Sequence, residues 1–180
     1  MNKKESWMQT FTGKKFFPFD PKAEDVNIKD IAHSLSLQCR FNGHCKRFYS
    51  VAQHSVLVSL IVKPEQKLAA LLHDAAETYF GDIIRPVRKN IKQIQPIEDK
   101  ILKTILEHFK IKNYDENEIL KADNIVLITE KRDLLSQSPD EWKEAKGSKP
   151  FPKKIRALPP KIAEEMFLKR YQKLKACRGI

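Results

Sequence analysis

The sequence predicts an all-α fold, a single bundle of about six or seven helices. Apolar residues recur at helical spacing in several stretches, and residues typical of helix starts and ends flank those stretches. Neither an internal repeat nor a convincing pair of strand-like segments interrupts this pattern. With 180 residues, 41% of them hydrophobic, we expect one domain over 1–180, in which 1–26 forms an extended, aromatic-rich lead-in.

The first two helices are predicted from their caps. Asn27 can cap a helix over 28–39, in which apolar residues fall on one stripe. Ser50 and Gln53 have the spacing of a capping box, which predicts a helix over 51–63.

A third helix is predicted from a proline and a glycine. Pro64 suits a first helical position and Gly81 suits the residue after a helix end, so we expect a continuous helix over 64–80, antiparallel to the preceding one. On such a helix His73 and Glu77, four residues apart, share one face.

The rest of the chain reads as helices joined by loops. The segment 83–88 contains a proline and lacks a clean period, so we expect a loop with at most one short helical turn. Further helices are predicted over 96–109, 116–135, 138–142 and 160–174.

Composition limits the possible partners. The formal net charge of +11 favours anionic ligands, but the basic residues are scattered without the aromatic interleaving of single-strand binders, so we expect a solvated basic surface and no nucleic-acid partner. No apolar run is long enough to span a membrane and no secretion signal opens the chain, which predicts a cytoplasmic protein without a membrane partner. Three cysteines without C-x-x-C spacing are expected to be reduced thiols.

Two polar residues interrupt apolar stripes. His54, taken alone, could be a core histidine that is hydrogen-bonded to a carbonyl. Asp123 lies on the apolar stripe of the helix over 116–135, and a carboxylate is costly to bury there unless it is paired. Lys121 and Arg132 are near it in sequence but lie on other faces of the helix. A metal ion would account for both residues at once.

Together with His73 and Asp74, these residues supply two imidazoles and two carboxylates from three helices. Such nitrogen and oxygen ligands suit one divalent transition metal, namely Zn, Co, Mn or Fe. The sequence contains no H-E-x-x-H, Walker A, G-x-S-x-G or G-x-G-x-x-G motif, which removes the main support for the enzyme classes that those motifs mark.

The order His54, His73-Asp74, Asp123 resembles the H…HD…D signature of the HD-domain phosphohydrolase superfamily. Two local strings are similar to its small nucleotidase branch, which includes bacterial 5′-deoxynucleotidases and phage deoxynucleotide hydrolases. They are the string from Phe48 to Ser55, and His73-Asp74-Ala75-Ala76-Glu77 with Gly81-Asp82 after it. The resemblance extends from Trp7 through Leu174.

The resemblance implies a role for each matching position. The metal ligands would be His54, His73, Asp74 and Asp123. The acids of catalysis would be Glu77 and Asp82. The substrate-binding residues would be Arg40, Phe41, Arg88 and Lys121, although the family more often has tryptophan where this chain has Phe41.

Each of these roles has a structural alternative. Glu77 could be an exposed helix acid, and Asp82 could cap a following turn. Arg40 could be a cation at a helix C-terminus, and Lys121 a solvated residue.

The resemblance implies hydrolysis of 2′-deoxynucleotides by a homo-oligomer. We expect a 5′-deoxynucleotidase that releases phosphate from deoxynucleoside monophosphates. The alternatives are a triphosphohydrolase acting on a substrate such as dATP with additional Mg²⁺, a basic nucleic-acid-binding protein with a vestigial site, and a two-iron oxidase. The oxidase would need more histidines in helical register than His33, His44 and His108 provide.

Overall fold

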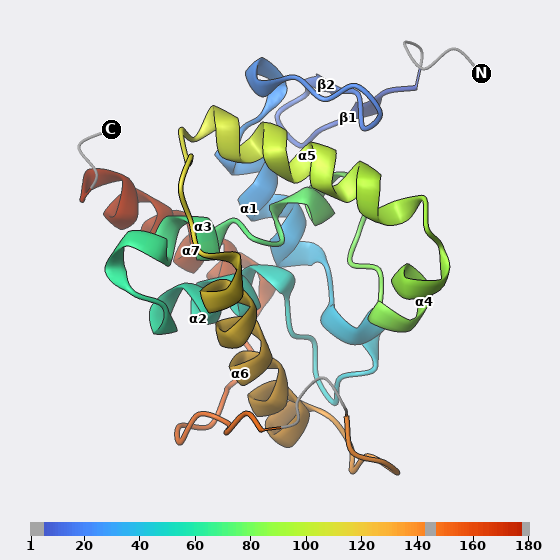
Figure 1. Ribbon diagram of the computed structural model, residues 1–180, viewed down its shortest axis with the longest axis vertical. Helices are drawn as coiled ribbons and strands as arrows, with labels where there is room; N and C mark the ends of the chain where they lie inside the picture. The colour runs from blue at the N-terminus through green and yellow to red at the C-terminus, as the bar shows by residue number, and fades with distance from the viewer. Residues whose placement is uncertain (1–5, 143–146, 178–180) are drawn as a thin grey trace.

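The computed structural model describes residues 6–142 and 147–177, and this part of the chain is all-α, as predicted (Figure 1). Its α-helices are α1 (Ile28–Leu37), α2 (Val51–Ile61), α3 (Lys67–Leu71), α4 (Arg85–Asn90), α5 (Ile94–His108), α6 (Glu116–Leu134) and α7 (Pro160–Ala176). Short 3₁₀ helices are η2 (Ala23–Asp25), η3 (Arg40–Gly43), η4 (Pro64–Gln66) and η5 (Ala75–Tyr79).

Helix α2 occupies the centre of the hydrophobic core. It packs against α1, α3, α6 and α7, while α5 covers η5 (Figure 1). Core side chains such as Ile31, Leu35, Val51, Leu71 and Phe167 are fully buried. Every polar side chain of α2 that faces this core therefore needs a partner.

The predicted caps of the first two helices are confirmed, with one difference. The side chain of Asn27 accepts from the Lys29 amide, and Ser50 accepts from the Gln53 amide at 3.2 Å. Gln53 does not reach back to complete a capping box. Its amide group instead binds the backbone of Arg156 and Leu158, and thereby fixes the segment before α7.

The predicted continuous helix over 64–80 is wrong. The chain forms η4 and α3, turns at 72–74, and continues as η5. His73 Nδ1 lies 2.8 Å from the Ala70 carbonyl, which in a continuous helix would accept from the Asp74 amide. Gly81 then ends η5 with a φ of 91°, so the predicted role of this glycine holds.

Three smaller expectations also differ. The segment after Asp82 forms the six-residue helix α4 rather than a single turn, and α5 begins at Ile94, before the expected start at Pro96. The predicted helix over 138–142 does not form, because this segment is irregular with a bend at residues 139 and 140.

The lead-in is only partly extended. Strands β1 (Met8–Gln9) and β2 (Lys15–Phe16) form a small antiparallel hairpin. Its turn is tied to α1 because Thr12 donates its amide and hydroxyl to Asp30, at 2.7 and 2.9 Å. No described helix has the length and apolar character needed to cross a membrane.

Candidate functional site

Three elements bring the predicted metal ligands together. Potential ligand atoms of His54 on α2, His73 after α3 and Asp123 on α6 all lie within 4.8 Å of one another. Asp74 joins this cluster, with Oδ1 3.3 Å from His73 Nε2 and Oδ2 3.6 Å from His54 Nε2. The turn at 72–74, rather than one face of a helix, is what lets adjacent His73 and Asp74 reach the same site.

In each histidine, the Nδ1 atom faces away from the cluster, and its contact fixes the orientation of the imidazole ring. His54 Nδ1 is 2.7 Å from Glu130 Oε1, and His73 Nδ1 is 2.8 Å from the Ala70 carbonyl. Both Nε2 atoms are buried and point into the cluster, where Nε2 of His54 lies 3.2 Å from Asp123 Oδ1. Histidine ligands of metals are commonly held in this way, so the residues present fit a divalent ion.

The electrostatics of the cluster favour a cation. Burial and the Arg40 guanidinium lower the pKa of His54, but the carboxylates of Glu130 and Asp123 outweigh them and raise it to about 9. Burial likewise opposes ionisation of Asp123, yet its hydrogen bond to His54 helps to hold the pKa of Asp123 below its ordinary value. Positive charge is therefore stabilised where the two Nε2 atoms meet the carboxylates.

Arg40 is part of this network rather than a cation at a helix end. It lies in η3, beyond the end of α1, and is 8% exposed. Its Nε is 3.2 Å from Glu130 Oε2 and its NH1 is 3.6 Å from Asp74 Oδ2. Fully buried Glu130 thus connects Arg40 to His54, which explains why a carboxylate occurs seven residues after Asp123 on α6.

Asp123 has a basic partner that sequence reasoning missed. Arg85 NH2, at the start of α4, is 2.7 Å from Asp123 Oδ2. The only signal for it was a basic residue in a segment predicted to be a loop.

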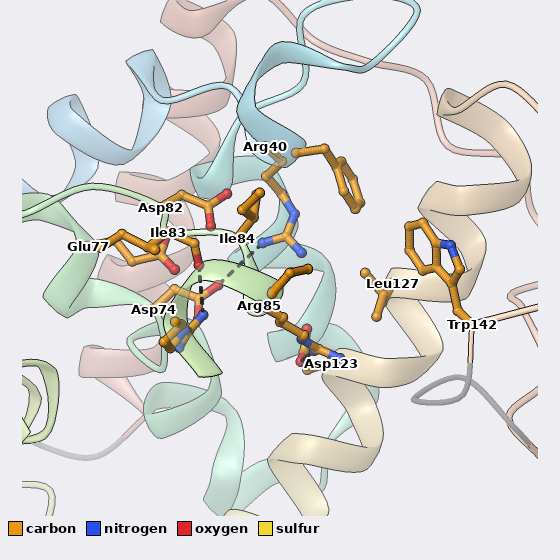
Figure 2. Close-up of a pocket in the computed structure, with 13 residues that line it drawn as sticks. Arg40, Asp74, Glu77, Asp82, Ile83, Ile84, Arg85, Asp123, Leu127 and Trp142 are labelled. Carbon is orange, nitrogen blue, oxygen red and sulfur yellow. Dashed lines mark hydrogen bonds and ion pairs between the residues drawn. The ribbon is translucent and has the colours of Figure 1, made fainter. Parts of the chain in front are cut away.

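Arg40, Asp74, Arg85 and Asp123 border a cavity of about 390 Å³ (Figure 2). Its lining combines arginines and carboxylates with aromatic and aliphatic side chains, and Trp142 and Leu127 lie away from the acids (Figure 2). The polar lining is Arg40, Asp74, Glu77, Asp82, Arg85, Arg88 and Asp123; the apolar lining is Phe41, Ile83, Ile84, Pro86, Leu127 and Trp142.

The predicted catalytic acids both face this cavity. Glu77 is 2% exposed, so the alternative of an exposed helix acid is wrong. Burial, followed by the nearby charges of Asp74 and Asp82, raises the pKa of Glu77 well above its ordinary value, and Glu77 Oε2 has no hydrogen-bond partner. Burial also raises the pKa of Asp82.

Gln38 supports both acids from the end of α1, and nothing in the sequence indicated it. Its Nε2 donates to the Glu77 carbonyl at 3.1 Å, and its Oε1 accepts from the Asp82 amide at 3.0 Å. Ser34 accepts from the same Nε2 at 2.9 Å. Gln38 therefore fixes the spacing of the bend that carries the two acids.

The remaining predicted substrate residues differ in their surroundings. Arg88 lines the cavity but is paired with Glu98, at 3.0 and 3.1 Å from its two carboxylate oxygens. Lys121 is exposed on α6 and is not among the residues that line the cavity. The structure thus brings Arg40, Phe41 and Arg88 to the site, but not Lys121.

Known proteins resemble this chain over most of its length. No protein-family model matches it. The uncharacterized protein YfdR of Escherichia coli K12 is 38% identical over 175 residues, which cover 96% of this chain and 98% of that protein. The uncharacterized protein RCAP_rcc00048 of Rhodobacter capsulatus is 37% identical over 108 residues, which cover 54% of this chain and 55% of that protein. Because the first similarity spans nearly all of both proteins, the chain belongs to the family that includes YfdR.

Proposed function

We propose that this protein is a metal-dependent phosphohydrolase of the HD-domain type that releases phosphate from 2′-deoxynucleoside monophosphates. One observation carries the proposal: the aspartates of a histidine–aspartate cluster line a cavity that also contains arginines, buried Glu77 and half-buried Asp82. Ligands for a cation, groups for a phosphate and groups that can move protons are thus gathered at one place.

The metal would be held by His54, His73, Asp74 and Asp123. When bound, a divalent ion supplies Lewis acidity and lowers the pKa of water. Zn, Co, Mn and Fe all suit these nitrogen and oxygen ligands.

The other side chains have separate tasks in this proposal. Arg40 and Arg85 hold the phosphate. To do so, Arg40 gives up part of its ion pair with Asp74, and Arg85 part of its ion pair with Asp123. Glu77, whose raised pKa favours a proton on its carboxyl group, gives that proton to the leaving oxygen. Asp82, across the same bend, can take a proton from the attacking water.

A substrate panel tests the proposal. Purified protein is incubated with each deoxy- and ribonucleotide at the mono-, di- and triphosphate level, with Mn²⁺, Co²⁺, Zn²⁺ or Fe²⁺, and the products are separated by chromatography. We expect nucleoside and phosphate from deoxynucleoside monophosphates. Ribonucleotides should turn over more slowly, because a pocket that fits the deoxyribose closely gives the 2′-hydroxyl no hydrogen-bond partner. Asp74→Asn should abolish the activity and retain the helix content.

The same panel separates the alternatives. Release of intact triphosphate from a substrate such as dATP, with additional Mg²⁺, would identify a triphosphohydrolase. Faster cleavage of an oligonucleotide than of any single nucleotide, or DNA binding without hydrolysis of any nucleotide, would contradict the proposal and favour a nucleic-acid-binding protein.

A further inference from the structure

The cavity is polar at one end and aromatic at the other. Figure 2 shows Trp142 and Leu127 across the cavity from Asp74, Glu77 and Asp82. A pocket divided in this way suits a ligand that has a charged group at one end and a flat, apolar group at the other.

The first aromatic residue, Phe41, is held in a strained turn. Its φ and ψ are 56° and 34°, and Asn42 after it has a φ of 51°. A bulky side chain seldom adopts this left-handed conformation, and such strain is concentrated at functional sites. The turn nevertheless places Phe41 in the cavity lining, with the Arg40 guanidinium carbon 5.3 Å from its ring centre.

The second aromatic residue, Trp142, comes from the irregular segment that follows α6. Its ring centre is 6.0 Å from that of Phe41, with 46° between the planes. Lys131 Nζ lies 5.0 Å from the Trp142 ring centre, a cation–π contact that ties the indole to α6. Stacked layers are separated by about 3.5 Å, so the two rings are too close for a base between them and instead form one wall.

We propose that Trp142, beside Phe41, forms the wall against which the base of a nucleotide stacks. The proposal rests on the proposed function, because phosphate at the arginines directs the base toward this end of the cavity. Every base has an aromatic face, so such a wall accepts all of them and predicts weak discrimination among bases.

Intrinsic fluorescence provides a direct test. The chain has two tryptophans, and Trp7 lies before β1, where Lys15 Nζ is 4.6 Å from its ring centre. Trp7→Phe therefore leaves Trp142 as the only tryptophan. Titration of this variant with dAMP or dTMP should quench the emission saturably, whereas 2-deoxyribose 5-phosphate, which lacks a base, should leave it almost unchanged.

Kinetics give a second, independent measurement. Stacking of one base is worth about 1–3 kcal/mol, so Trp142→Ala should raise KM for dAMP roughly 5- to 150-fold. Trp142→Phe should restore most of this loss. Hydrolysis of 2-deoxyribose 5-phosphate should be equal in Trp142→Ala and the wild type, and Trp7→Ala serves as the matched control with an unchanged KM.

The outcomes separate the two proposals. Hydrolysis of dAMP with unchanged Trp142 emission and with an unchanged KM in Trp142→Ala would overturn the base wall and leave the proposed function standing. Saturable quenching by nucleotides without hydrolysis of any of them would support the wall and overturn the proposed function. An absence of both would overturn both.

Discussion

Glu130 binds two charged groups at once from a fully buried position. It accepts from His54 Nδ1 at 2.7 Å and faces Arg40 Nε at 3.2 Å. Burial opposes its ionisation, but the charge of Arg40, followed by that of His54, keeps the pKa of Glu130 below its ordinary value. A single ionised carboxylate therefore sets both the tautomer of His54, the proposed metal ligand, and the position of Arg40, the proposed phosphate-binding group.

We expect Glu130→Gln to weaken metal binding roughly 10- to 100-fold, since second-layer partners of metal-binding histidines have effects of this size. The change keeps the volume and removes the charge, so helix content should be retained. Calorimetric titration with Mn²⁺ or Zn²⁺ measures the affinity. Glu107→Gln, at an exposed position on α5, is the matched control. Equal affinities of the two variants would show that Glu130 does not orient His54.

At the scale of elements, the bend between η5 and α4 depends on the end of α1. Gln38→Ala removes two hydrogen bonds to the backbone of this bend, each worth about 1 kcal/mol. The two acids would lose their fixed spacing, and we expect kcat to fall about 10- to 100-fold with a loss of stability of about 2 kcal/mol. Gln95→Ala, which removes only a surface bond to Asp99, should leave kcat unchanged. A loss of stability in Gln38→Ala without a change in kcat would assign Gln38 a structural role only.

The segment before α7 is held to the end of α6 by Asp133. Asp133 accepts from the Ile155 amide at 2.7 Å and from Arg132, whose hydrogen bond lowers the pKa of Asp133. A carboxylate whose pKa is lower in the folded state contributes stability above its unfolded pKa of about 4 and loses it as the pH falls through the folded value.

Asp133→Asn should therefore lower the free energy of unfolding by about 1 kcal/mol at neutral pH, and this difference should shrink as the pH falls below about 4. Urea unfolding of both proteins across the acid range measures it. Asp99→Asn, at an exposed position on α5, is the control. A difference independent of pH would show that charge on Asp133 is not involved.

At the scale of the whole molecule, the cluster joins three separate parts of the core. His54, His73 and Asp123 come from α2, the turn after α3, and α6, so an ion bound to all three stabilises only the folded chain. When the concentration of the free ion is about 100 times its dissociation constant, binding adds about 2.7 kcal/mol to the free energy of unfolding. Removal of the metal should therefore lower Tm by roughly 5–10 °C.

Thermal unfolding with a chelator and after metal is restored measures this shift. Asp123→Leu should show no dependence on metal and should be at least as stable as the metal-free wild type, because it removes a buried charge while Arg85 is free to turn toward solvent. If Asp123→Leu unfolds while the folded remainder keeps its metal, Asp123 belongs to a structural ion pair with Arg85.

Sequence alone determined the fold class and most helix positions. Apolar residues at helical spacing identify the buried face of a helix without reference to any other element, and caps such as Asn27 and Ser50 act within a few residues. The same local logic singled out His54 and Asp123, because a polar side chain on an apolar stripe requires an explanation.

Only the tertiary structure decided which distant groups complete the site. Arg85 and Gln38 bind partners that lie 38 or more residues away along the chain, and Trp142 contacts Phe41 from a distant segment. The break in the helix after α3 also depends on the tertiary structure. Nδ1 of His73 binds the Ala70 carbonyl, while Nε2 of the same ring faces the cluster. Helical periodicity records which face is buried, but not which charges from other elements meet there, because those contacts depend on how the elements pack.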